Sequence, residues 1–257
     1  HLARMSLRVF SAIFLAVCCM IAAGTLATYR PAAVATAAAP TDDLVGYGKR
    51  LVSQTFAEIG PDTDKPFAGN RLACQNCHLN DGSKHAGIPL IGVARAYPKF
   101  SARSGRVISL TERIDECMTR SMNGKALPEG SREMAAFLAF IGSLDGPPAV
   151  QASPAPEPPA PADADRGAGV YARTCAVCHQ PRGLGLRAGM GYRFPPLWGP
   201  DSFNDGAGMD RFDRAVVFIQ QNMPRGIDPA HPQLDLQEAW DVAAFLKARP
   251  RPHYAGR

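Results

Sequence analysis

Two copies of the motif Cys-x-x-Cys-His, at residues 74–78 and 175–179, constrain this chain more than any other feature. The two thiols of such a motif can form thioethers to the vinyl groups of a haem, and the histidine can reach the iron as proximal ligand. A redox dithiol is expected within a βαβ pattern, and a zinc site needs further Cys or His ligands close by. Neither context is present here. We therefore expect two covalently bound haem c groups (iron), held by the cysteines and histidines of the two motifs: Cys74, Cys77, His78, Cys175, Cys178 and His179.

A run rich in proline and alanine separates the two motifs, and it occupies residues 147–164. Such a composition does not form a core and tends to be extended, so this segment is expected to be a linker. It divides the chain into two domains, residues 38–146 and 165–257, each near the smaller end of the usual range of domain size.

The two halves follow one plan, in which a helical approach leads to the motif, a proline-containing loop, a candidate distal ligand and a closing helix. Both closing helices contain Ala-Ala-Phe-Leu, at residues 135–138 and 243–246. Ser131 is expected to cap the first, and Asp235 with Glu238 to form a capping box for the second. No alternating apolar and polar stretch favours a sheet. We therefore predict an all-α fold of two class I cytochrome c domains.

The N-terminal segment indicates export from the cytoplasm. Arg8 is followed by an apolar run, Val9–Ala27, and then by small residues in A-x-A form up to Ala37. This pattern is typical of a secretory signal, although the run is also close to the length that spans a bilayer. We expect residues 1–37 to be a signal peptide or an N-terminal membrane anchor, and the protein to be periplasmic.

The charge balance argues against nucleic acid as a partner. The formal net charge is +5, but three of the arginines lie in residues 1–37, and without them 25 basic residues face 23 acidic ones. A nearly neutral chain has no broad footprint for nucleic acid or a membrane surface. Membrane association is expected only if the N-terminal segment is retained.

Met223 is the leading candidate for the sixth ligand of the second haem. Pro224 disfavours helix at the preceding residue, so the helical run 211–221 should end at Met223 and leave the methionine in a loop. A loop-borne thioether facing the haem is the usual arrangement, and His/Met ligation raises the reduction potential, which suits electron exit. The other candidates are Met190, Met209 and His231.

In the first half the equivalent stretch holds Cys117, the one thiol that belongs neither to a motif nor to the N-terminal segment. Ser109 and Glu112 predict a capping box that opens a helix through Cys117. On that helix Arg113, Cys117 and Ser121 fall at i, i+4 and i+8, so they line up along one stripe. A cation, a thiol and a hydroxyl on one haem-facing stripe form an unusual grouping.

Two alternatives to Cys117 as a ligand remain open from the residues alone. Cys117 can be an inert buried thiol, in which case Met118 or Met122 is the sulfur ligand. His85 is a weaker candidate, because it sits in a short polar loop soon after the first motif.

Two stretches resemble the dihaem thiosulfate dehydrogenases (TsdA type): residues 69–79, which include the first motif, and residues 113–125. The resemblance covers roughly residues 42–250. It implies that Cys117 is the distal ligand of haem 1, that haem 1 is the catalytic haem and that haem 2 relays electrons. It also implies that two thiosulfates are coupled oxidatively to tetrathionate, in a reaction that can be reversible. Electrons would pass from haem 1 to haem 2 and then to an external acceptor, such as a small cytochrome or other redox protein.

Coupling two thiosulfate dianions forces negative charges together and removes two electrons. A competent site needs cations, a sulfur nucleophile and an electron sink. Arg113 supplies a guanidinium on the Cys117 stripe, and Ser121 can donate to a sulfonate oxygen. Arg103 and Lys125 are further candidates, placed by the family pattern and by their proximity in sequence.

Two other functions fit parts of the sequence. A dihaem electron carrier without catalysis explains both motifs and Met223, but it leaves the stripe of Arg113, Cys117 and Ser121 without a role. A haem subunit of a larger sulfur-oxidising complex, resembling the SoxA group, also uses a Cys-ligated haem. The short second domain with its own methionine favours an independent enzyme over that subunit.

Overall fold

The computed structural model describes residues 41–147 and 155–256. The signal or anchor predicted at residues 1–37 lies outside this range, as do residues 148–154 of the predicted linker. Both haem motifs belong to one compact unit, Pro40–Arg257. No helix in the part of the chain described here is long and apolar enough to cross a membrane.

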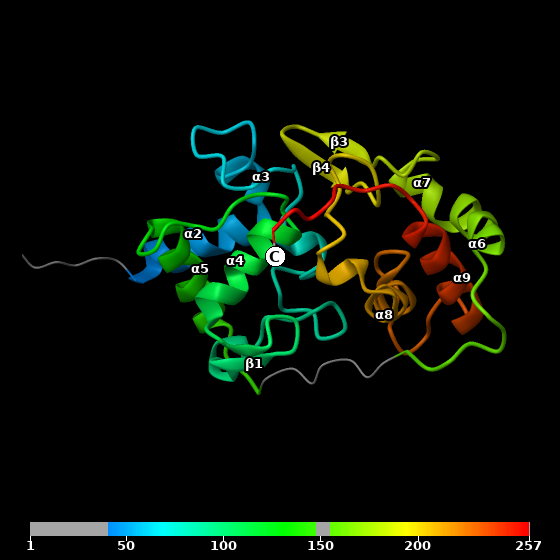
Figure 1. The fold of residues 1–257 in the computed structure, drawn as a ribbon, viewed down its shortest axis with the longest axis horizontal. Helices are drawn as coiled ribbons and strands as arrows, with labels where there is room; N and C mark the ends of the chain where they lie inside the picture. Colours follow the sequence, from blue (N-terminus) through cyan, green and yellow to red (C-terminus); the bar gives the residue numbers. More distant parts are fainter. Residues whose placement is uncertain (1–40, 148–154, 257) are drawn as a thin grey trace, which may run out of the picture. The chain divides into compact units, whose positions relative to one another are not determined.

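The first half is built on two helices that lie side by side, α2 (Thr41–Ser53) and α5 (Arg132–Ser143), with α4 (Leu110–Arg120) packed nearby (Figure 1). Gly48 makes the close approach possible, because a Cβ at this position would overlap the carbonyl oxygen of Ala136. Shorter elements complete this half: α3 (Thr55–Glu58), η1 (Cys74–Asn76), η2 (Val93–Ala96), β1 (Lys99–Ser101) and β2 (Arg106–Ile108).

The second half repeats this arrangement with α6 (Ala164–Val170) against α9 (Leu236–Lys247). Here Gly167 lies against the backbone of Asp241 as Gly48 does against that of Ala136. Helix α8 (Phe212–Asn222) packs on α9 and leads to the distal side of the second haem motif. The remaining elements are η3 (Tyr171–Cys175), α7 (Ala176–His179), β3 (Leu186–Ala188), β4 (Gly191–Phe194) and η4 (Gly208–Asp210).

The helix caps predicted from the sequence are confirmed. The Ser109 hydroxyl accepts from the Glu112 amide at 3.1 Å, and the Glu112 carboxylate accepts from the Ser109 amide. Helix α4 therefore begins with a capping box. The Ser131 side chain caps α5 by accepting from the Met134 amide, and Asp235 with Glu238 forms a capping box at α9. The first of these caps fixes the start of the helix that carries Cys117.

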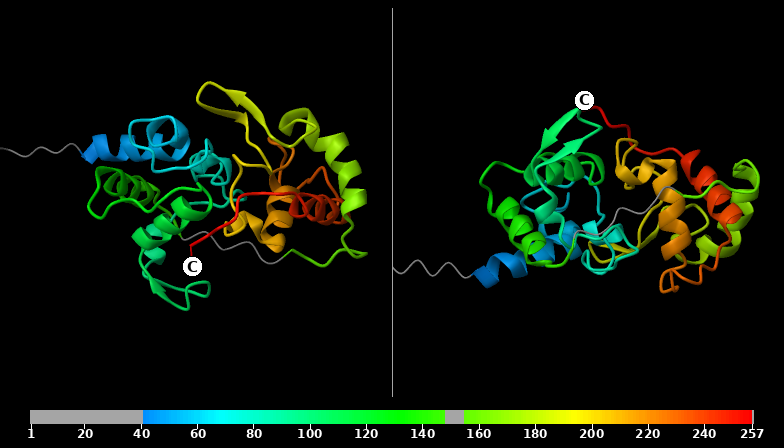
Figure 2. Two further views of the ribbon diagram at one scale, coloured as in Figure 1. Left: turned by 45° about the horizontal axis from the view of Figure 1, so that its top comes forward. Right: turned by 90° about the horizontal axis from the view of Figure 1, so that it is seen from below.

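The all-α class is correct for the core, which is formed by helices, but two β-hairpins were not predicted. Each strand has only three or four residues, too few to give a recognisable alternation in the sequence. The hairpin β1–β2 stands out beyond the start of α4 in both views of Figure 2. Its exposed pair, Phe100 opposite Val107, faces away from the core.

A short segment of the second half, residues 201–206, binds to the first half. Phe203 packs against the core of the first half. The Asn204 side chain donates to the Thr119 carbonyl at 3.0 Å, and the Ser202 carbonyl accepts from the Asn123 side chain at 2.6 Å. The second half is therefore anchored at the C-terminal end of α4, close to the residues that the sequence marks as functional.

The described part of the proline/alanine run is bound to the second half. The Pro156 carbonyl accepts from the Trp240 indole at 3.1 Å, and the Ala160 amide donates to the Gln237 side chain at 2.8 Å. Residues 155–163 therefore lie along α9, and α6 begins directly after them.

Candidate active site

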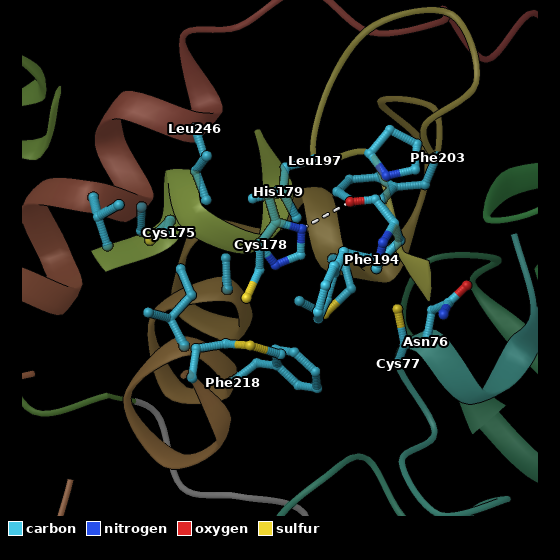
Figure 3. Close-up of a pocket in the computed structure, with 18 of the residues that line it drawn as sticks. Asn76, Cys77, Cys175, Cys178, His179, Phe194, Leu197, Phe203, Phe218 and Leu246 are labelled. Carbon is cyan, nitrogen blue, oxygen red and sulfur yellow. Dashed lines mark hydrogen bonds between the residues drawn. The ribbon is translucent and has the colours of Figure 1, made fainter. Parts of the chain in front are cut away.

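The second motif opens onto a deep apolar cavity. Cys175, Cys178 and His179 line it, with Phe194 and Phe218 among the walls (Figure 3). The cavity encloses about 1430 Å³ of empty space, its open mouth included. Its walls are predominantly apolar, which suits a large planar group with an apolar face.

Both motif histidines are oriented by a backbone carbonyl. His179 Nδ1 lies 2.8 Å from the Pro195 oxygen (Figure 3), and His78 Nδ1 lies 2.7 Å from the Ile88 oxygen. Because a carbonyl can only accept, Nδ1 carries the proton in each ring and Nε2 keeps its lone pair. Burial also lowers the pKa of His179, which favours the neutral ring. This is the state in which imidazole binds a metal.

A buried guanidinium at the rim of the cavity provides a direct test of fit to a haem. The Arg251 side chain is only 7% exposed, its Nε lies 3.2 Å from Asp210 Oδ1, and its Nη2 donates to the Leu246 carbonyl at 2.9 Å. Its Nη1 is buried and has no partner, although Arg251 lines the cavity. A carboxylate in the cavity would satisfy this donor, and haem carries two propionates. The donor set and the apolar walls therefore fit a haem.

Two of the four candidate distal ligands line this cavity. Helix α8 ends at Asn222, and Met223 is extended (φ −122°, ψ 135°), as the following proline predicts. Met223 lines the cavity, as does Met209. Met190 is 40% exposed between β3 and β4, and the His231 side chain is 85% exposed. Neither of these two lines the cavity.

The cysteines of the first motif are half-buried, and their thiols are protonated. Thr55 Oγ1 accepts from the Cys74 amide at 3.1 Å and donates to Cys74 Sγ at 3.4 Å. Burial raises the pKa of Cys74 to about 11 and that of Cys77 to about 12. Cys77 also borders the cavity of the second motif, on the side away from Cys178 (Figure 3). The two motifs are therefore neighbours.

Cys117 differs from these thiols. Its sulfur lies 3.1 Å from Arg113 Nη1. Burial alone would raise the pKa of Cys117, but the charge of Arg113 and the nearby His78 ring lower it to about 7. An inert buried thiol would show the opposite shift. Met118 and Met122, the alternative ligands, are 1% and 3% exposed and pack in the core of the first half.

The Arg113 guanidinium is held in place from two sides. Glu116 Oε2 lies 3.6 Å from Arg113 Nη1, and Glu116 in turn accepts from the Ser104 hydroxyl at 2.8 Å. The Tyr97 hydroxyl also interacts with Arg113, as the influence of each on the pKa of the other indicates. Arg113 is therefore fixed beside Cys117.

The other three residues predicted from the sequence, Arg103, Ser121 and Lys125, lie in different surroundings. Arg103 is exposed on the β1–β2 loop, and its Nη1 donates to the Gly206 carbonyl of the second half at 3.0 Å. Ser121 is the C-cap of α4, one turn beyond Cys117. Lys125 is exposed, and its Nζ lies 5.5 Å from the centre of the Phe67 ring, with no described contact to Cys117. The structure thus brings Arg113 to Cys117 but does not bring Lys125 there.

Three residues of these sites were missed by the sequence analysis: Thr55, Tyr97 and Arg251. Each reaches its site through packing between segments that are distant in the sequence. No local pattern marks any of them.

The chain has two haem-attachment motifs, and in each the histidine is oriented by a backbone carbonyl. One motif faces an apolar cavity that contains a buried cation. These features define the class of protein, a dihaem c-type cytochrome. Family models agree with this division. Residues 64–145 match the family described as SoxA/TsdA, cytochrome c domain, and residues 162–246 match cytochrome C oxidase, cbb3-type, subunit III.

Whole-chain comparisons identify the family. The chain is 39% identical to the thiosulfate dehydrogenase of Allochromatium vinosum, over 89% of this chain and 86% of the relative. It is 41% identical to that of Stutzerimonas stutzeri, over 80% of this chain and 69% of the relative. The chain belongs to the thiosulfate dehydrogenase family of dihaem cytochromes, and it carries two covalent haem c groups.

A solved structure shares the fold. It is that of the thiosulfate dehydrogenase (TsdBA) of Marichromatium purpuratum, with a TM-score of 0.73 and 35% identity. The match covers 86% of this chain and 49% of that one, so this chain spans about half the length of the solved protein.

Proposed function

We propose that this chain is a periplasmic thiosulfate dehydrogenase. Two thiosulfate dianions are joined by a bond between their terminal sulfurs, which gives the tetrathionate dianion and releases two electrons. The two haems supply the electron sink, and an external redox protein, such as a small cytochrome, takes the electrons onward. The contact of Arg113 with Cys117, opposite His78, is the observation that carries this proposal.

The residues that hold the haems follow from the two motifs. In the first half, Cys74 and Cys77 form the thioethers, His78 is the proximal ligand and Cys117 the distal one. The facing positions of His78 and Cys117 support this assignment. A thiolate stabilises ferric iron, so this ligand lowers the potential of the first haem.

In the second half, Cys175 and Cys178 form the thioethers, and His179 and Met223 are the axial ligands. All four line one apolar cavity, and Met223 lies in extended backbone just after α8. Neutral His/Met ligation in an apolar pocket raises the potential, which favours electron flow toward the second half.

The chain's own residues prepare the substrate for coupling. Arg113 offsets the charge of a bound thiosulfate beside Cys117, and Arg103, whose pKa is lowered in part by the charge of Arg113, adds a second cation. Ser121 is within one turn of Cys117 and supplies a hydroxyl for a sulfonate oxygen. Lys125 has the weakest support, because it contacts Phe67 and not the stripe.

A steady-state assay with thiosulfate as donor and ferricyanide as acceptor tests the proposal. We expect one tetrathionate for every two thiosulfates and every two ferricyanides consumed. Haem that is reduced by dithionite but not by thiosulfate, with no tetrathionate formed, would instead identify a non-enzymatic electron carrier.

A further inference from the structure

The surroundings of Cys117 hold more positive charge than the nearby carboxylates neutralise. Arg103, Arg120 and Arg214 make no ion pair with any carboxylate in residues 41–147 and 155–256. The Arg120 Nε is buried and lacks a hydrogen-bond partner, and its guanidinium stacks over the Tyr254 ring at 4.3 Å. Arg120 and Arg214 are partly buried, and cations that lack a carboxylate partner indicate a binding site for an anion.

Arg214 comes from the second half but does not serve the cavity of the second motif. It lies in the first turn of α8, and other residues of that helix, such as Ala215 and Phe218, line the cavity while Arg214 does not. Its side chain is partly buried, and its Nη1 lies beside Gly208. Asp213, its neighbour, is already paired with Arg211 at 2.9 Å.

The charges of the first half act on Arg214. Burial, and then the charges of Arg211 and Arg113, lower the pKa of Arg214, while Cys117 raises it. Neighbouring arginines also act on Arg103: desolvation and the charges of Arg120, Arg113 and Arg214 lower its pKa. The geometry agrees with this, because Arg103 donates to the Gly206 carbonyl and Arg214 Nη1 lies beside Gly208, two residues further along the chain.

Hydrogen bonds between the halves hold this arrangement. Arg103 donates to the Gly206 carbonyl at 3.0 Å, and the Asn204 amide donates to the Arg120 carbonyl at 3.3 Å. The segment between Gly206 and α8 is short, so the position of Arg214 is tied to that of the first half. A guanidinium fixed in this way binds an anion without first losing conformational freedom.

We propose that Arg214 of the second half completes the substrate site of the first half, where it binds a thiosulfate together with Arg103 and Arg113. This inference rests on the proposed function. Two thiosulfates bring four negative charges to the site, and Arg113 alone offsets one of them. Arg103, Arg120 and Arg214 supply the other three. Tetrathionate carries only two negative charges, so the same cations hold the product less strongly than the two substrates.

Direct binding of thiosulfate tests the proposal without requiring turnover. Calorimetric titration is performed on the haem-loaded, electrochemically reduced protein, which cannot accept further electrons. Arg214→Gln should weaken thiosulfate binding about tenfold, as expected for the loss of one charged hydrogen bond. Arg214→Lys should restore part of the affinity. In steady state the KM for thiosulfate should rise while kcat changes little.

Arg187→Gln provides the matched control. Arg187 is also an arginine of the second half, but it is 46% exposed and its charge is paired with Asp201 at 3.6 Å. This variant removes the same net charge and should bind thiosulfate as the unmodified protein does. If both variants bound thiosulfate equally weakly, the effect would come from the loss of net charge alone, and the proposal would be overturned.

Two further outcomes would also overturn it. Thiosulfate affinity could be unchanged in Arg214→Gln. The variant could instead shift a haem potential in the absence of thiosulfate while its affinity stays the same, which would assign Arg214 to a haem propionate. If the unmodified protein binds thiosulfate through Arg214 but forms no tetrathionate, the proposed function fails and the binding role stands. If it binds no thiosulfate, both fail.

Discussion

The two halves of the molecule share a proximal side and differ on the distal side. In each, a glycine (Gly48 or Gly167) lets the first helix cross the last, and the motif histidine is oriented by a carbonyl. In the first half the proposed distal ligand, Cys117, is inside a helix and beside a cation. In the second half it is Met223, beyond the end of a helix and among apolar walls.

The difference shows how one scaffold supports two roles. A residue inside a helix has neighbours at i−4 and i+4, so Cys117 brings Arg113 and Ser121 with it. A residue in extended backbone after a helix has no neighbours aligned with it at i−4 and i+4. Met223 instead lies among the apolar walls of the cavity. The first arrangement suits a charged substrate. The second excludes water and suits electron transfer.

Replacing the distal residue of the first half with that of the second should have the largest effect. We expect Cys117→Met to keep both haems, because the motif cysteines are untouched. Thiosulfate oxidation should fall by roughly 10³-fold or more, as when a group that acts in the chemical step is lost. The potential of the first haem should rise, since a neutral thioether stabilises ferric iron less than a thiolate. Redox titration and the ferricyanide assay measure these changes.

Cys117→Gly separates the loss of the thiol from the gain of a thioether. It should lose the low-spin signature of thiolate ligation and be equally inactive. Oxidation of thiosulfate at the normal rate, with an unchanged spectrum of the first haem, would show that Cys117 is a core thiol.

Removing the cation of the first half should have the next largest effect. Arg113→Ala loses a charged hydrogen bond worth about 1.5–3 kcal/mol, which corresponds to a KM for thiosulfate about 10–100 times higher. Haem content should not change. Arg106→Ala is the control, because Arg106 is 60% exposed and its pair with Glu112 is a surface ion pair. A normal KM in Arg113→Ala would contradict a substrate-binding role.

The sequence predicts those parts of the sites that lie within one element. The capping box at Ser109 and the spacing of Arg113 and Cys117 are local, and both are confirmed by the geometry of α4. Pro224 likewise predicts the end of α8. Lys125 illustrates the limit, because proximity in the sequence did not bring its side chain to the stripe.

Contacts between distant segments could not be predicted from local patterns. Arg251 reaches the second cavity from the C-terminal tail, and residues 201–206, a short distance before Arg214 in the chain, bind to α4. The linker suggested two separate domains, whereas Phe203 of the second half packs in the core of the first. Such contacts depend on packing between elements, for which a single sequence carries no periodic signal.

On the second half, Met223→Gly should affect electron exit more than substrate binding. The near-infrared band of ferric His/Met haem should be lost and the potential of the second haem should fall, because the thioether that favours ferrous iron is gone. The KM for thiosulfate should stay within about twofold, since a residue on the relay affects a step after binding. Retention of the band would move the ligand to Met209, the other methionine that lines the cavity.

The smallest effect concerns the buried carboxylate that joins the first and last helices in each half. Asp241 is 3% exposed and accepts from Arg166 at 2.7 and 2.8 Å and from the Asp163 amide at 2.8 Å. Burial opposes its ionisation, but these donors lower the pKa of Asp241 below its usual value. In the first half, Glu133 is 4% exposed and accepts from the Tyr47 hydroxyl of α2 at 3.2 Å, but its ion-pair partner Lys65 is 63% exposed.

We therefore expect Asp241→Asn to destabilise the protein by about 2 kcal/mol at pH 7, and Glu133→Gln by less, because an exposed partner is screened by water. Since the folded pKa of Asp241 is depressed, its contribution is present above the unfolded value of about 3.9 and is lost as the pH falls through the folded value. Urea unfolding, followed by haem absorbance, measures the free energy of unfolding of Asp241→Asn and of the unmodified protein. The two free energies should converge below about pH 4. A difference that is independent of pH would show that the side chain acts through packing and not through its charge.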